Sequence, residues 1–466
     1  MLPDNVTRMQ KPTQPADGGA PPAGGKGPKR EKKIDGGALT HLRLNFVLIN
    51  TTDTAYDEST GLLWKINTMR LSHGHDEVKM WLGDKVTRRA IFPDQLQFEP
   101  GKDLAEPAIN LFRGFAMAPK AGSLAPIIEL AAHLHAESAA TPEGCAANLA
   151  WTLRWLALPL QNPGAKMRTA LVFHGPQGAG KNLFFEIAAA IYGRYALVVG
   201  QDQLEDKFND WASQKLFLIG DEVVARAELY HQKNKLKAFI TGETIQINAK
   251  MLPLRTEANH CNVVFLSNEN QPLALEESDR RYHVIYTPPR RDDDLYARVA
   301  KCLAEGGAQA LMHYLMTLDL GDFNEYTLPP ITRAKADLIE LGLKPAERFV
   351  QDWLANRLDL PVRVCSSEQL YRAFVRWCAA TGERFPPPQV TFSKGVEKAS
   401  RGRLRLDPVK LDEVSASGKA WLRVWVPGEC GPMNGVSRGA WARMAVDSFD
   451  NELRRFGRVG DAGDAA

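Results

Sequence analysis

The chain has 466 residues, of which 44% are apolar and 24% charged, and its formal net charge at pH 7 is +3. This length allows about two or three domains with their own cores. The near balance of charge excludes a protein that is basic over its whole surface, so any basic surface must be local. The six cysteines form no CxxC pair, which argues against a disulfide framework and a zinc site.

The N-terminal third of the chain divides into three predicted segments. Residues 1–37, rich in Pro, Gly and Lys, are expected to form a disordered basic tail. Residues 38–120 contain strand-like runs such as LRLNFVLIN and GLLWKI, which predict a small α+β accessory region. Residues 121–165 are predicted to be helical through SLAPIIELAAHLHAE and PEGCAANLAWTLRWLALPL. One helix face should lie in the core and carries Trp151, Trp155 and Leu158.

Residues 166–330 are predicted to form the main α/β core. The runs TALVFHG, YALVVG, KLFLIGDE and NVVFLSNEN are almost continuously apolar. Unbroken apolar runs are typical of parallel strands that are covered on both faces. Helical segments alternate with these runs, so the fold class that we expect is α/β with the parallel sheet of a P-loop NTPase.

The first strand leads into a candidate phosphate-binding loop, GPQGAGKN. A strand at 170–174 precedes it and a helix at 183–192 follows, which is the context that the G-x-x-x-x-G-K spacing requires. Glycines let backbone N–H groups line a concave nest, and the helix N-terminus adds a favourable dipole. The alternative is a simple tight turn. The residues expected to hold the nucleotide are Gly175, Pro176, Gln177, Gly178, Ala179, Gly180, Lys181 and Asn182.

Three residues downstream of the loop complete the predicted site: Asp221, Glu222 and Asn268. Lys181 would neutralise the β- and γ-phosphates, and Asp221 would hold Mg²⁺. Asn182 stands where Ser or Thr is usual, but its amide oxygen can also ligate a hard cation. Glu222 would orient and deprotonate the attacking water, and Asn268 would contact the γ-phosphate. Solvated loop carboxylates and a turn asparagine are the alternatives.

These motifs together resemble those of the superfamily 3 helicases, most closely the helicase part of phage and plasmid primase-helicases. The resemblance rests on GPQGAGKN, FNDWASQKLFLIGDE, LKAFITGETIQINAK, VVFLSNEN and SDRRYHVI, and it covers residues 105–300. It implies an AAA+-like ring, usually a homo-hexamer, with ATP and Mg²⁺ between subunits. It also implies an arginine that reaches the neighbour's nucleotide, with Arg280 as the first candidate and Arg281 as the second.

The segment ETIQINAKMLPLRTEANH predicts two strands around a turn near Leu252–Pro253. The resemblance implies that this hairpin grips DNA through Lys250 and Arg255, with His260 as a weaker candidate. The alternative is that these are solvated hairpin charges.

Residues 331–427 are predicted to form a winged-helix-like DNA-binding domain, and residues 428–466 a tail with a helix near 438–456. A capping box links Ser366 to Gln369, and that helix should stop at Gly382. A second helix and a two-stranded wing follow. Basic winged helices also serve as protein docking modules. The basic residues of this region are Arg384, Lys394, Lys398, Arg401, Arg403 and Arg405, of which Lys394, Lys398, Arg401 and Arg403 are the DNA-contact candidates.

The sequence therefore predicts an ATP-dependent, ring-forming DNA helicase for the replication of a phage, prophage or plasmid, acting on single-stranded and forked DNA. An initiator or DNA-binding scaffold without processive unwinding is the alternative, and a metabolic P-loop kinase fits less well. No priming domain is expected, so a separate primase and a replication initiator are candidate partners. No signal segment and no run of about 20 apolar residues is present, which predicts a protein of the bacterial cytoplasm without membrane contact.

Overall fold

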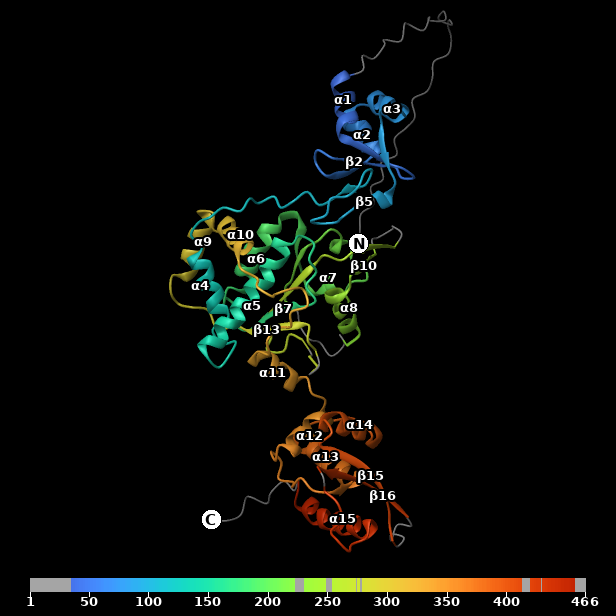
Figure 1. The fold of residues 1–466 in the computed structure, drawn as a ribbon, viewed down its shortest axis with the longest axis vertical. Coiled ribbons are helices and arrows are strands. Elements are labelled where there is room, and N and C mark those ends of the chain that lie inside the picture. The colour runs from blue at the N-terminus through green and yellow to red at the C-terminus, as the bar shows by residue number, and fades with distance from the viewer. Residues whose placement is uncertain are drawn as a thin grey trace, which may run out of the picture. The chain divides into compact units, whose positions relative to one another are not determined.

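A computed structural model describes residues 35–222, 230–248, 254–273, 275–276, 279–412, 420–428 and 430–456, without the side chains of 230–235. The chain divides into two compact units (Figure 1). The first comprises residues up to Gln97 together with Ala105–Ile109, and the second comprises Phe98–Leu104 together with the residues from Asn110 onward. The predicted tail lies largely outside the described residues.

In the described part of the first unit, three helices pack on a four-stranded sheet of order β3-β2-β1-β4. Its first helix begins at Gly36, inside the predicted tail, because the Asp35 side chain accepts hydrogen bonds from the N–H groups of Gly37 and Ala38. The predicted strand run over 42–50 is wrong in its first half. Leu42 is fully buried on a helix face there, and the strand begins only at Phe46. The elements are α1 (Gly36–Asn45), β1 (Phe46–Ile49), β2 (Thr54–Asp57), β3 (Leu62–Lys65), α2 (Ile66–His73), α3 (His75–Gly83), β4 (Arg89–Ile91) and β5 (Leu96–Gln97).

The second unit contains the predicted parallel sheet. Its strands are β7 (Ala170–His174), β8 (Ala196–Val199), β9 (Phe217–Gly220), β12 (Asn262–Ser267) and β13 (Tyr282–Tyr286). They lie in the order β13-β7-β12-β9-β8, and every neighbouring pair is parallel. The sequence predicts four of these strands. It misses β13 because SDRRYHVI is interpreted only through its arginines, although Tyr282, Val284 and Ile285 are buried.

Helices cover both faces of this sheet (Figure 1). Leu171 and Phe173 of β7 point into one core, and Ala170 and Val172 point into the other, as the two-residue period of a strand requires. The predicted core residues Trp151, Trp155 and Leu158 are buried in the first of these cores. The helices of the first core are α4 (Ala125–Leu134), α5 (Pro142–Gln161), α6 (Lys181–Tyr192), α9 (Leu295–Ala304) and α10 (Gly307–Thr317); those of the second are α7 (Gln201–Glu205), α8 (Tyr230–Thr241) and α11 (Arg333–Leu341).

The predicted hairpin is present as two antiparallel strands, β10 (Thr244–Ile247) and β11 (Arg255–Ala258). Thr244 pairs with Ala258 at one end, and Ile247 pairs with Arg255 at the other. The predicted turn and Lys250 lie outside the described residues, so the structure gives no position for that lysine.

The C-terminal part of the second unit has the predicted helix, helix, hairpin order. The capping box is confirmed, since the Ser366 N–H donates to the Gln369 Oε1 at 2.9 Å and the Gln369 N–H donates to the Ser366 Oγ at 3.1 Å. The helix ends at Gly382, as predicted. A short strand, β14, joins the hairpin in an antiparallel sheet of order β14-β16-β15. The elements are α12 (Pro345–Leu354), β14 (Cys365–Ser366), α13 (Ser367–Thr381), α14 (Gln389–Ser400), β15 (Leu404–Lys410), β16 (Trp421–Pro427) and α15 (Arg438–Arg455).

Within the described ranges, no helix is long and apolar enough to cross a membrane. The winged-helix class of the C-terminal part stays a prediction.

Candidate nucleotide-binding site

The loop between β7 and α6 requires glycine at two positions where the backbone is left-handed or tightly packed. Gly175 has a φ of 131°, and a Cβ there would lie 2.6 Å from the Thr287 carbonyl oxygen. Gly180 has a φ of 101°, and its Cβ would lie 2.7 Å from Leu130 Cδ1. A side chain at either position would force backbone or core atoms apart. The loop conformation is therefore a specific feature that these glycines allow.

Lys181 is the first residue of α6, and it is only 4% exposed. Its Nζ donates hydrogen bonds to the Gly175 carbonyl oxygen at 2.8 Å and to the Pro176 carbonyl oxygen at 2.9 Å. Burial lowers the pKa of this ammonium group, while the nearby Asp221 carboxylate acts in the opposite direction. The positive charge is thus held within the curve of the loop, where phosphate oxygens could replace the two carbonyls as its partners.

A cavity of 450 Å³ lies over this loop at the carboxyl edge of the sheet. It brings together three predicted groups that are far apart in the sequence: the loop, the Asp221–Glu222 pair and Asn268. Ligands of parallel sheets bind at this edge, and the volume is that of an ordinary small-molecule site. The cavity is lined by Gln177, Gly178, Ala179, Gly180, Lys181, Asn182, Leu183, Asp221, Glu222, Asn268, Arg290 and Tyr296.

Asn182 and Asp221, the two predicted metal ligands, are in direct contact. The Asn182 Nδ2 donates to the Asp221 Oδ2 at 2.7 Å, and the Glu222 N–H donates to the other carboxylate oxygen at 3.0 Å. The described residues contain no cluster of three or more His, Cys, Asp or Glu side chains suited to a metal. This donor set fits Mg²⁺, which usually takes one or two protein carboxylates and completes its shell with water and phosphate oxygens.

Glu222, the predicted base, has a left-handed backbone with a φ of 55°, which is unusual for a residue with a side chain. Such a conformation costs on the order of 1 kcal/mol or more and persists only where the surroundings impose it. Its exposed side chain lines the nucleotide cavity and also an adjoining cavity that Asn268 shares. Asn268 directly follows β12 and is exposed. Both groups therefore face the space beside the loop.

Arg290 and Tyr296 line the cavity as well, although no sequence motif indicates either residue. The Arg290 guanidinium carbon lies 4.4 Å from the centre of the Tyr296 ring, and the Tyr296 hydroxyl donates to the Ala179 carbonyl oxygen at 3.2 Å. Had β13 been predicted as a strand, Arg290 could have been placed at this site. A residue that follows a parallel strand beside β7 must emerge at the same edge as the phosphate loop.

The two arginine-finger candidates do not line this cavity. Arg281 donates from Nη1 to the Asp279 Oδ1 at 3.3 Å, and Asp279 is 2% exposed. Arg280 is exposed. A side chain that serves a neighbouring subunit must be accessible, so the arrangement favours Arg280 over Arg281, and the role itself stays a prediction.

The candidates for DNA contact lie in two other places. On the hairpin, Arg255 is paired with Glu257 at 2.7 Å and donates to the Ser213 Oγ at 3.2 Å. On α14, Lys398 is paired with Glu347 at 2.8 Å. Both charges are thus partly compensated within the chain. Exposed positions are also occupied by Lys394, Arg401 and Arg403.

Comparison with known proteins relates the chain to a phage replication protein. Residues 173–281, which include the phosphate loop, Asp221, Glu222 and Asn268, match a family of unknown function, DUF5906. A DNA primase-polymerase of Nitratiruptor phage NrS-1 is 36% identical over 138 residues, which are 28% of this chain and 19% of that relative. The chain thus matches about a fifth of the relative's length.

Solved structures of the apo C-terminal region of NrS-1 share the fold. One has a TM-score of 0.60 at 18% identity and another a TM-score of 0.57 at 17% identity. Each alignment covers 82% of this chain and 96% of that region. The chain is therefore an α/β protein with a five-stranded parallel sheet, similar to the C-terminal region of a phage primase-polymerase.

Proposed function

We propose that this protein is an ATP-dependent, ring-forming DNA helicase of superfamily 3 that serves the replication of a phage, prophage or plasmid. One observation carries the proposal: a single cavity at the sheet edge is lined by the phosphate loop, Asp221, Glu222 and Asn268. A glycine-rich turn with only a structural role would not need the Asp221–Glu222 pair and Asn268 beside it. The sequence match to a phage DNA primase-polymerase supports a role in replication.

Each residue has a distinct task in this proposal. Lys181 binds phosphate oxygens, while Asn182 and Asp221 supply oxygens for Mg²⁺. Glu222 orients a water molecule and accepts its proton, and Asn268 holds that water in line. ATP supplies the phosphoryl group whose transfer to water drives movement. Arg280 completes the site of a neighbouring copy, and a homo-hexamer encircles single-stranded DNA at a fork.

The first test is ATP hydrolysis by the purified chain with Mg²⁺, with and without single-stranded DNA. We expect DNA to stimulate hydrolysis. Lys181→Ala and Arg280→Ala should each abolish it, whereas Lys301→Ala, an exposed lysine of the same unit, should not change it. Full ATPase activity in both the Lys181 and the Arg280 variants would refute the mechanism.

A second candidate is an initiator or scaffold that uses ATP to assemble on DNA without processive unwinding. The exposed basic residues of the C-terminal part, which we propose to be a winged helix, favour this function. A strand-displacement assay on forked DNA separates the two. Unwinding supports the helicase, while hydrolysis and DNA binding without unwinding support the initiator. A separate primase and a replication initiator are the partners that we propose for a helicase.

A further inference from the structure

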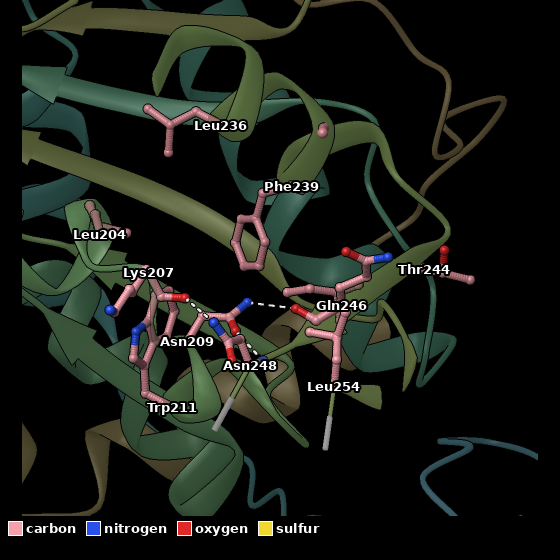
Figure 2. A pocket seen from close by; sticks show the side chains of 12 residues that line it. Leu204, Lys207, Asn209, Trp211, Leu236, Phe239, Thr244, Gln246, Asn248 and Leu254 are labelled. Atoms are coloured by element: carbon pink, nitrogen blue, oxygen red, sulfur yellow. Dashed lines mark hydrogen bonds between the residues drawn. The ribbon is translucent and has the colours of Figure 1, made fainter. Parts of the chain in front are cut away.

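A second cavity, of 460 Å³, lies beside the hairpin (Figure 2). It is formed by α7 and the chain that leads from it towards β9, by helix α8, and by the hairpin, through β10, Asn248 and Leu254. None of its lining residues is shared with the nucleotide cavity. They are Leu204, Lys207, Asn209, Trp211, Leu236, Ala238, Phe239, Thr244, Ile245, Gln246, Asn248 and Leu254.

Two asparagines fix one wall of this cavity. The Asn209 Nδ2 donates to the Gln246 carbonyl oxygen at 2.8 Å, and the Asn209 Oδ1 accepts from the Asn248 N–H at 2.7 Å. The Asn248 Nδ2 in turn donates to the Lys207 carbonyl oxygen at 3.0 Å. Figure 2 shows these bonds joining the loop to the hairpin strand. The wall is thus set before any ligand arrives, which reduces the entropy lost on binding.

The lining combines aromatic faces with a polar rim. Phe239 and Trp211 are half-buried, with ring centres 6.3 Å apart and ring planes at 61°. Trp211 Nε1 is buried and has no hydrogen-bond partner among the described residues. At the rim, Lys207, Thr244 and Gln246 are exposed and offer an ammonium, a hydroxyl and an amide group.

We propose that this cavity binds a nucleobase of single-stranded DNA that the hairpin holds, an inference that rests on the proposed function. A base has flat apolar faces, a polar edge and an attached phosphate. The aromatic rings, the Thr244 and Gln246 side chains and the Lys207 ammonium match these three features in turn. An apolar side chain from a second copy of the chain could pack against the two aromatic rings. It would leave the polar groups of the rim without hydrogen-bond partners.

The test compares two fluorescein-labelled oligonucleotides of equal length and charge, oligo-dT and a fully abasic strand, by anisotropy with the full chain. The wild type should bind oligo-dT about tenfold more tightly than the abasic strand, since each stacked base contributes measurably. Phe239→Leu keeps apolar volume but removes the flat ring, so it should abolish this preference without weakening abasic binding. Phe323→Leu, a half-buried phenylalanine outside the cavity, is the matched control and should keep the preference.

Lys207→Gln changes an exposed residue and leaves the core intact. It should weaken both strands by the same factor, about threefold, because Lys207 would contact phosphate and not the base. A factor that differs between the two strands, or no loss at all, would contradict the placement of the phosphate at this rim.

The outcomes that overturn the proposal are distinct. Equal binding of both strands by the wild type would refute the base site and leave the proposed helicase standing. The base site would also be refuted, and the proposed helicase left standing, if Phe239→Leu kept the preference for oligo-dT but changed the oligomeric mass. That result would mean that a second copy of the chain fills the cavity. Failure of the wild type to bind either strand would refute the proposed function and the base site together.

Discussion

Arg290 lines the nucleotide cavity together with Lys181 and so adds a second positive charge to it. Its guanidinium is held over the Tyr296 ring, and the Tyr296 hydroxyl is bonded to the phosphate loop itself. A cation in this position can bind the phosphates of the same subunit, in contrast to the trans role proposed for Arg280. The pairing with Tyr296 orients the guanidinium in advance and so limits the rotamer entropy lost on binding.

We predict that Arg290→Ala weakens ATP binding about tenfold or more and ADP binding less, because a charge-assisted hydrogen bond to the terminal phosphate would be lost. Arg290→Lys should restore part of the affinity. Equilibrium binding of fluorescent ATP and ADP analogues measures both. Equal losses for the two nucleotides would place the Arg290 contact on the base, ribose or inner phosphates instead.

Asn182 is one of the two residues that we propose as Mg²⁺ ligands. Its amide donates to the Asp221 carboxylate, so Asn182→Ala would leave that carboxylate without its 2.7 Å donor and would also remove one of the oxygen ligands that we propose for Mg²⁺. Loss of such an orienting contact typically weakens metal binding about 10- to 100-fold. We therefore expect the Mg²⁺ concentration for half-maximal ATP hydrolysis to rise by at least about tenfold. Asn182→Ser should stay near the wild-type value, since a hydroxyl can both ligate the metal and bond the carboxylate. An unchanged Mg²⁺ requirement in the Ala variant would remove Asn182 from the metal site.

At the scale of elements, α14 and the turn that leads from it into β15 carry exposed basic residues of the C-terminal part. Lys394 and Arg403 are exposed, and neither forms an ion pair within the described residues, whereas Lys398 is paired with Glu347. We predict that Lys394→Gln combined with Arg403→Gln weakens duplex binding and lowers the slope of log affinity against log salt by about 2, one for each phosphate contact. Lys398→Gln should change the slope less, because Glu347 already compensates that charge. Titrations at several salt concentrations measure the slopes, and an unaltered slope in the double variant would argue for a protein-docking surface.

The sequence predicts the elements where a local rule is sufficient. Apolar runs indicate β7, β8, β9 and β12, and the capping box places the start of α13 at the right residue. Prediction from the sequence fails for elements whose burial depends on segments that are distant in the chain. Strand β13 carries His283 within its apolar run and becomes a strand because β7 offers a partner. Strand β14 has only two residues and exists because β16 lies beside it. Because β13 is not predicted, the place of Arg290 in the cavity is not predicted either, since Arg290 follows that strand.

At the scale of the whole molecule, three buried histidines link stability to pH. Burial lowers the pKa of His135 to about 4 and that of His174 to about 4, and it holds the pKa of His283 well below the ordinary value of 6.5. His135 and His283 are fully buried. His174 ends β7 directly before the phosphate loop. The lowered pKa values favour the neutral form of all three rings in the folded chain near pH 7.

The unfolded chain binds protons at these rings near pH 6.5, while the folded chain does not, so the stability is fully present above that pH and falls as the pH drops toward about 4. Each histidine contributes a slope of up to about 1.4 kcal/mol per pH unit in this window. We predict that the urea midpoint for loss of amide protection in β7 and β13 decreases steadily from pH 7 to pH 5. His135→Gln, which can still bond to Ala131 and Thr152, should make the decrease shallower, and His75→Gln, on an exposed site of the other unit, should not. A midpoint that stays constant over this range would mean that the folded chain takes up protons at these rings as readily as the unfolded chain does. The parallel sheet would then have to accommodate buried positive charge next to its phosphate loop.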